Sequence, residues 1–407
     1  WWLYFMMSGG IALFFVIPAL WTNYLHQRHP RSIALIDAGF WLTAYLAMGA
    51  VFSLRMTLAA SIVSLSSPWT AISSAAMAAV NLFLDLLGHP RARRMAIHAD
   101  LGRAEWASTP ETVERVAAEA GIPLTVVRRP AGDLVDRWVQ RFESGKRRYE
   151  ALETYNLIGP WSSASLRFCQ SEMKAAVIGP AVARMHQGAQ VISILGLRRD
   201  ESHNRASIPI ARVDERYAKA GNRHGTRMMI WNPLADWTSD DVFRAHRLLG
   251  ILLHEAYTTW GSSRLSCRYC IFASLQDLEA SASAPANAEV YRELVGIEAR
   301  STFPFQPTRW LADVSPRLLS AGLRSDVARA KADRDERRRL EASMPPGLRY
   351  VKGWPLRLPS QSEAEDIAAA RRVILARHSL AERFPTASSV IERFAELLAI
   401  AARKAAR

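Results

Sequence analysis

The stretch that decides the fold of this chain runs from Val191 to Arg205 and has the sequence VISILGLRRDESHNR. Its opening run, Val191 to Leu195, is short and largely apolar, and such a run predicts a buried β-strand. Gly196 and the paired Arg198 and Arg199 then follow at the carboxyl end of that strand. Because open α/β sheets bind ligands at this edge, the stretch predicts an α/β sheet with a ligand-binding loop after the strand.

A second informative stretch runs from Trp231 to Val242 and has the sequence WNPLADWTSDDV. Its pattern is that of a turn followed by the start of a helix. Thr238 or Ser239 is a suitable N-cap residue, because its hydroxyl can accept a hydrogen bond from the first turn. Asp240 and Asp241 would then lie in that first turn, where a carboxylate interacts favourably with the helix dipole. We therefore expect a helix to begin at this cap.

The segments on the amino-terminal side alternate between strand and helix patterns. Parallel strands need a crossover connection, which is usually a helix, so this alternation predicts a parallel α/β sheet. The expected elements are strands at Ala59–Leu65, Met95–His98 and Ile122–Val127, and helices at Ala71–Gly88 and Pro110–Ala120.

Two further segments occur between these elements and the arginine-rich stretch. Asp100-Leu101-Gly102, with Glu105 after it, follows the second expected strand, and LRFCQSEMK occupies residues 166–174 at the start of an expected helix. These segments and the two stretches above occur in the order found in the PAPS-reductase-like branch of the adenine nucleotide α-hydrolases, the PP-loop superfamily. The chain resembles that branch over roughly residues 90–275.

The resemblance implies an enzyme, either an oxidoreductase like phosphoadenosine phosphosulfate reductase or a sulfurtransferase. It would bind an adenine nucleotide, ATP or PAPS, and act in sulfur or nucleotidyl transfer. The side chains expected to take part in catalysis are Arg198, Arg199 and Glu201. Those expected to bind the nucleotide, with Gly196, are Asp100, Glu105, Arg167, Lys174 and Arg205.

The sequence departs from this family at two places. The family's phosphate loop has the form S-G-G-x-D-S, but Ser66–Thr70 has neither the glycines nor the aspartate, and Pro68 removes an amide donor. Ser8-Gly9-Gly10 lies inside an apolar run and lacks the acidic residue. The family's reductases also carry a catalytic cysteine in a carboxyl-terminal tail, whereas no cysteine follows Cys270. Two alternatives therefore stay open: a non-catalytic nucleotide-binding or membrane-tethered protein, and an enzyme of nucleic-acid thiolation or phosphorothioation.

The three cysteines form the candidate metal site. Cys169 and the C-x-x-C pair Cys267 and Cys270 are too few for a disulfide framework and fit a reducing compartment. Three thiolates could hold a 4Fe–4S cluster with one open iron, or zinc with His254 or His203 as the fourth ligand. Unliganded structural cysteines and a redox-active pair are the alternatives.

The composition of the chain is basic, because Lys and Arg outnumber Asp and Glu. The formal net charge of +14 favours a polyanionic partner such as a nucleotide, nucleic acid or an anionic membrane surface.

Residues 1–57 are apolar and include candidate transmembrane helices, which would anchor the chain to the inner membrane. Residues 58–275 are expected to form the α/β domain, and 276–407 a basic helical domain that could contact a nucleic-acid substrate. The catalytic domain is expected in the cytoplasm.

Overall fold

The structure is a computed structural model of the 407-residue chain. It describes residues 61–66, 80–86, 88–218, 221–349 and 354–405, together with isolated positions at 16–18, 22, 37, 38, 41, 42, 45 and 78. Apart from those isolated positions, the expected membrane helices of residues 1–57 fall outside these ranges, and so does most of the degenerate phosphate loop. No helix in the described part of the chain combines the length and apolar character needed to cross a bilayer.

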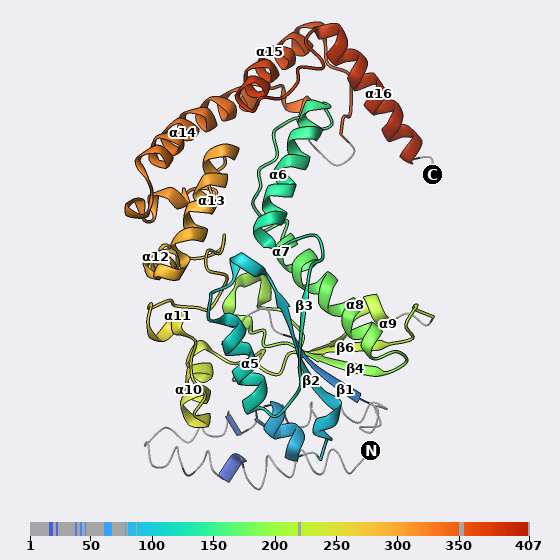
Figure 1. The fold of residues 1–407 in the computed structure, drawn as a ribbon. Helices are drawn as coiled ribbons and strands as arrows, with labels where there is room; N and C mark the ends of the chain where they lie inside the picture. Colours follow the sequence, from blue (N-terminus) through green and yellow to red (C-terminus); the bar gives the residue numbers. More distant parts are fainter. Residues whose placement is uncertain are drawn as a thin grey trace. The chain divides into compact units, whose positions relative to one another are not determined.

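The centre of the fold is a six-stranded sheet with the order β3-β2-β1-β4-β6-β5 (Figure 1). β1 pairs in parallel with β2 and β4, and β4 pairs in parallel with β6, which confirms the predicted parallel α/β sheet. β5 is antiparallel to β6 and forms one edge. The strands are β1 (Ser61–Ser66), β2 (Arg94–Asp100), β3 (Leu124–Arg128), β4 (Gln190–Ile194), β5 (Ala211–Val213) and β6 (Arg227–Trp231).

The sequence of β4 explains its central position. A strand with a partner on each side and helices over the sheet has both faces covered, which favours an apolar run. Val191, Ile192 and Ile194 are accordingly buried, and Ile192 and Ile194 pack in one apolar core with Trp231 of β6. The predicted buried strand is therefore confirmed, and its carboxyl end leads directly into the loop that begins at Gly196.

The chain folds into two compact units. Unit 1 comprises Trp1–His98, Val113–Val126 and Ile178–Leu252, and unit 2 comprises Ala99–Thr112, Val127–Val177 and Leu253–Arg407. These boundaries differ from the expected division at residue 275, because the segments after β2 and β3 belong to unit 2. The helices associated with the sheet are α5 (Thr109–Glu119), α8 (Ala176–Met185), α9 (Glu215–Ala218) and α10 (Ser239–Leu249).

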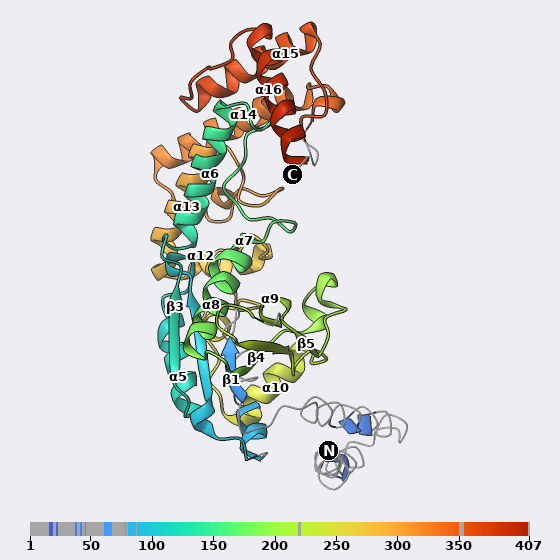
Figure 2. The ribbon, with the colours of Figure 1, turned by 90° about the vertical axis from the view of Figure 1, so that its right-hand side faces the viewer.

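Unit 2 is predominantly helical, as expected for the carboxyl-terminal region. α6 lies alongside α13, and α13 packs on α14 as α15 packs on α16 (Figure 2). Trp138 of α6 is buried against Trp161 and Phe305, with ring centroids 5.4 and 6.1 Å away. The helices of this unit are α6 (Leu134–Glu150), α7 (Phe168–Gln170), α11 (Glu255–Thr258), α12 (Leu275–Ser283), α13 (Ala288–Ser301), α14 (Ala321–Ala342), α15 (Gln361–Arg377) and α16 (Ala387–Ala405).

Candidate functional site

The arginine-rich loop leaves the sheet at its carboxyl edge, the end at which β1, β4 and β6 finish. Two backbone hydrogen bonds hold this loop against the segment after β6. Leu195 N donates to the carbonyl of Trp231 at 2.9 Å, and Arg199 N donates to that of Ala235 at 2.8 Å. The two stretches that the sequence singled out therefore lie side by side in unit 1, as neighbouring strands of a parallel sheet require.

The start of α10 is fixed by a capping box. The Thr238 hydroxyl accepts from Asp241 N at 3.2 Å, and the Asp241 carboxylate accepts from Thr238 N at 2.9 Å. Thr238 is therefore the N-cap, which confirms one of the two predicted positions. Ser239 becomes the first residue of the helix and lies at the carboxyl edge.

Arg198 is the most buried arginine of this loop. Its side chain is 7% exposed, and both terminal nitrogens donate to the Ser239 hydroxyl at 3.2 Å. It also donates to the Asp200 carboxylate at 3.2 Å, and that carboxylate accepts from Ser239 N at 3.1 Å. Arg198, Asp200 and the first turn of α10 thus form one hydrogen-bonded group.

The other two arginines of the loop are also paired with carboxylates. Arg199 forms an ion pair with Asp236 and donates twice to the carbonyl of Ile208, at 2.9 and 3.1 Å. Arg205 forms an ion pair with Glu201, whose other oxygen lies 3.6 Å from Nε of Arg198.

The carboxyl-edge cluster is thereby charge-balanced. We use this name for Arg198, Arg199, Asp200, Glu201, Arg205 and Asp236, which carry three positive and three negative charges. The three arginines alone would make this edge basic, but the structure sets a carboxylate against each guanidinium. An anionic ligand at this edge must therefore compete with these carboxylates.

The acidic residues expected near the nucleotide lie in unit 2. Asp100 accepts from Gly102 N at 2.6 Å and forms an ion pair with Arg128, so its carboxylate is engaged within the protein. Glu105 is 9% exposed, and its backbone carbonyl accepts from Arg268.

The basic residues of the 166–174 segment also belong to unit 2. The Arg167 guanidinium lies over the ring of Phe272, 5.0 Å from its centroid, and donates to the carbonyl of Ala164 at 3.3 Å. Lys174 lies in a π-helical turn, Ser171–Ala175, and its charge acts on the Cys267 thiol. The predicted helix start in this segment is confirmed by α7 and this turn.

The three cysteines lie in unit 2 on the same apolar core. Burial raises the pKa of the Cys267 thiol, which the charge of Lys174 only partly offsets, and burial likewise raises the pKa of Cys270. Cys270 Sγ accepts from Phe272 N at 3.4 Å. Burial thus disfavours the thiolate form of both residues of the C-x-x-C pair.

These cysteines lack the arrangement expected of a metal centre. Within the described ranges, no group of three or more His, Cys, Asp or Glu side chains is placed to hold a metal ion. The candidate fourth ligand, His254, uses both ring nitrogens inside the protein. Its Nδ1 accepts from Ala256 N at 3.0 Å, and its Nε2 lies 3.1 Å from the Ser108 hydroxyl. The iron–sulfur and zinc interpretations thus find no support in this geometry, and no role in the function rests on them.

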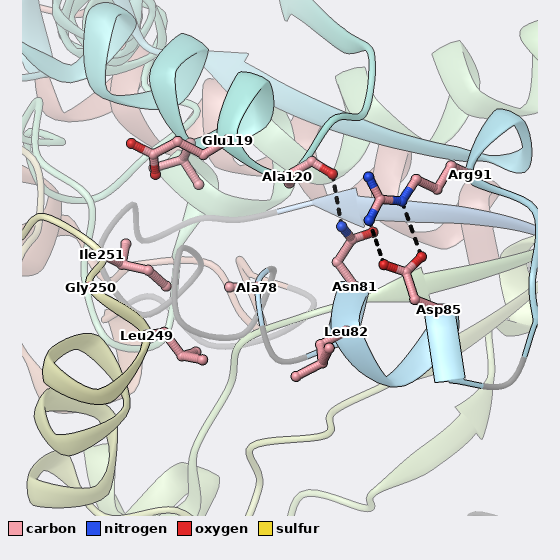
Figure 3. A pocket seen from close by; sticks show the side chains of 11 residues that line it. Ala78, Asn81, Leu82, Asp85, Arg91, Glu119, Ala120, Leu249, Gly250 and Ile251 are labelled. Atoms are coloured by element: carbon pink, nitrogen blue, oxygen red, sulfur yellow. Dashed lines mark hydrogen bonds and ion pairs between the residues drawn. The ribbon is translucent and has the colours of Figure 1, made fainter.

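A pocket of about 350 Å³ lies elsewhere in unit 1 (Figure 3). Its wall includes Arg91, just before β2, and Ala120, just before β3, so it lies at the amino-terminal edge of the sheet. Asn81 donates to the carbonyl of Ala120 at 2.8 Å, and Asp85 forms an ion pair with Arg91 at 2.6 Å. None of the predicted site residues lines this pocket.

Three residues of the carboxyl-edge cluster and its surroundings were not among the site residues expected from the sequence. Asp200 and Ser239 accept hydrogen bonds from Arg198, and Asp236 forms an ion pair with Arg199. Asp200 could have been found, because an acidic residue directly after paired arginines is a natural partner for them. Asp236 and Ser239 follow a different strand, so only the parallel pairing of β4 with β6 brings them here.

Two family models match different parts of this chain. The model of the phosphoadenosine phosphosulfate reductase domain matches residues 67–272, just over half of the chain. The chain therefore belongs to this family, which is part of the adenine nucleotide α-hydrolases. A separate family of proteins of unknown function, DUF1761, matches residues 1–53.

A solved structure is similar to part of this chain. The crystal structure of phosphoadenylyl-sulfate (PAPS) reductase from Candida auris, a phosphate complex, is 14% identical. The match covers 55% of this chain and 87% of that one, with a TM-score of 0.33. No curated protein matches the chain.

Proposed function

We propose that this chain binds an adenine nucleotide, ATP or PAPS, at the carboxyl edge of its sheet and acts in sulfur or nucleotidyl transfer. Membership of the phosphoadenosine phosphosulfate reductase domain family supports the nucleotide class. The observation that carries the proposal is Arg198, a buried guanidinium at the end of a central parallel strand and in contact with the first residue of α10. Ligands of open α/β sheets bind at this edge.

The chemistry expected of these residues is electrostatic. Attack on the sulfonyl group or the α-phosphoryl group of such a nucleotide increases negative charge on its oxygens. Arg198 and Arg205 would stabilise that charge, because a guanidinium donates two parallel hydrogen bonds to such oxygens. Both side chains are largely shielded from water, at 7% and 14% exposed, which strengthens the interaction.

Reduction through a thiol is not part of the proposal. Residues 271–407 contain no cysteine, so this part of the chain supplies no thiol of the kind that the family's reductases carry in their tail. Burial also raises the pKa of Cys267 and Cys270, so neither thiol is activated to replace it.

A second candidate function is nucleotide binding without turnover. The segment Ser66–Thr70 lacks the glycines and the aspartate of the family's phosphate loop, and this observation favours such a role. The two candidates share the binding site and differ in catalysis. Sulfate, phosphate or pyrophosphate release from a bound nucleotide would favour the enzyme, and binding without release would favour the second candidate.

Calorimetry on the intact chain with PAPS, ATP and AMP tests the proposal. Losing one bidentate contact in Arg198→Ala should cost about 1–3 kcal/mol, which weakens binding roughly 5- to 150-fold. Arg91→Ala is the matched control, because Arg91 is also ion-paired but lies at the opposite edge of the sheet. Equal affinity in wild type and Arg198→Ala, or no nucleotide binding by the wild type, would refute the proposal.

A further inference from the structure

Glu201 differs from the other carboxylates of the carboxyl-edge cluster in the interactions that keep its side chain in place. It lies between two guanidinium groups, in an ion pair with Arg205 and 3.6 Å from Nε of Arg198. Its side chain is 14% exposed, and within the described residues no backbone N–H donates to either of its oxygens. Attraction to the two arginines is therefore the main interaction that keeps this carboxylate in place.

The neighbouring carboxylates are held differently. Asp200 accepts from the backbone N–H of Ser239 at 3.1 Å, so moving it would uncap the first turn of α10. Asp236 pairs with Arg199, whose guanidinium is also fixed by the carbonyl of Ile208. Glu201 is thus the carboxylate whose departure breaks no backbone hydrogen bond and exposes two arginines at once.

We propose that Glu201 is a displaceable internal anion, which occupies the place of the nucleotide's anionic group until that group binds. The proposal rests on the proposed function, because it concerns the same edge of the sheet. When the ligand arrives, the carboxylate moves away and the ligand's oxygens take over Arg198 and Arg205.

This exchange determines the class of ligand that can bind. Arg198 and Arg205 face the carboxylates of Asp200 and Glu201, so these four side chains carry no net charge while Glu201 stays in place and one net positive charge once it moves away. A monoanionic group only replaces the charge of the carboxylate that it displaces, and so gains little attraction. A phosphate dianion brings one more negative charge between the same two guanidinium groups and can outcompete the carboxylate. The site should therefore favour nucleotides that present a dianionic phosphate to this edge.

Replacing Glu201 by its uncharged isostere tests this idea on the intact chain. In Glu201→Gln, inorganic phosphate and ATP meet Arg198 and Arg205 without the opposing charge of Glu201, so both should bind at least about tenfold more tightly than to the wild type. Glu119→Gln is the matched control. It makes the same chemical change in a glutamate that is paired with Arg115, at the other edge of the sheet, and should leave both affinities unchanged.

The results of these binding measurements distinguish a failure of this inference from a failure of the proposed function. Unchanged or weaker phosphate binding by Glu201→Gln would overturn the inference, because Glu201 would then position the arginines rather than compete for them. Tighter phosphate binding without any nucleotide binding would support the inference and overturn the proposed function. If neither protein bound phosphate or a nucleotide, both the inference and the proposed function would be refuted.

A second variant covers the case in which Glu201→Gln does not fold. Glu201→Asp keeps the charge but shortens the side chain by one methylene, which weakens its hold on both arginines. It should bind phosphate more tightly than the wild type by a smaller factor than the Gln variant. An unchanged or lower affinity would contradict the inference.

Discussion

Replacing Asp277 by asparagine should loosen the loop that carries the C-x-x-C pair. Asp277 lies in the first turn of α12 and is 4% exposed. Its Oδ1 accepts from the hydroxyl and the N–H of Ser263, at 2.9 and 2.8 Å, and from the hydroxyl of Ser262 at 3.1 Å. Its Oδ2 accepts from the hydroxyl of Ser274 at 2.8 Å. One carboxylate thus ties the segment before Cys267 to the start of α12.

The size of the effect follows from the charge of the acceptor. A hydrogen bond to a charged group contributes about 1.5–3 kcal/mol, against about 0.5–1.5 kcal/mol for a neutral one. Four bonds lose this difference in Asp277→Asn, but three of them share one oxygen and are not additive. We therefore expect a loss of about 2–3 kcal/mol in the free energy of unfolding of unit 2 at neutral pH.

The pKa of Asp277 determines how the stability difference between wild type and Asp277→Asn should change with pH. Burial raises the pKa of Asp277, but the hydrogen bonds from Ser274, Ser263 and Ser262 together hold it below its ordinary value of 3.8. Because the folded pKa is lowered, the stabilisation is fully present above pH 3.8 and is lost as the pH falls through the folded pKa. The gap between wild type and Asp277→Asn should therefore close in acid.

Urea unfolding from pH 7 to pH 3 measures this gap, and the alkylation rate of Cys267 reports local opening of the loop. Asp326→Asn is the control, since it removes an equal charge from an exposed pair with Arg329. A stability difference below about 0.5 kcal/mol at pH 7, or one that stays constant down to pH 3, would refute the reasoning.

Two further predictions concern the helix cap and the thiols. Thr238→Ala removes the capping box of α10 and should lower the free energy of unfolding by about 1 kcal/mol in urea titration; no loss of stability would mean that the cap does not hold this helix. Because burial raises the pKa of Cys267 and Cys270, iodoacetamide at pH 8 should modify both more slowly than free cysteine, as followed by mass spectrometry. Modification at the rate of free cysteine would show that these thiols are not held protonated.

The elements of the sheet could be predicted from the sequence because their signals are local. The apolar run at Val191 lies in β4, and the strand expected at Met95 lies in β2. The hydroxyl and carboxylate spacing at Thr238 and Asp241 is a capping box that needs only four consecutive residues. Such patterns depend on neighbours within one turn or one strand, so they can be recognised without knowing the fold.

The net charge of the carboxyl-edge cluster could not be predicted from such local patterns. The sequence shows the arginines, but it does not show that Asp236, 37 residues after Arg199, becomes its partner. Another example is Arg103 of unit 2, which forms ion pairs with Asp133, Asp136 and Glu293 from two helices and a preceding turn. These pairs depend on strand order and helix packing, so a stretch that looks basic can be neutral once folded.

The most direct test of the central claim is hydrogen–deuterium exchange on the intact chain, with and without saturating PAPS or ATP. If the nucleotide binds at the carboxyl edge, amide exchange should slow in residues 196–205 and in residues 232–241, which contain the cluster and the start of α10. Protection that is absent from both segments and appears instead around the pocket at the opposite edge, in residues 80–91 and 249–251, would contradict the account.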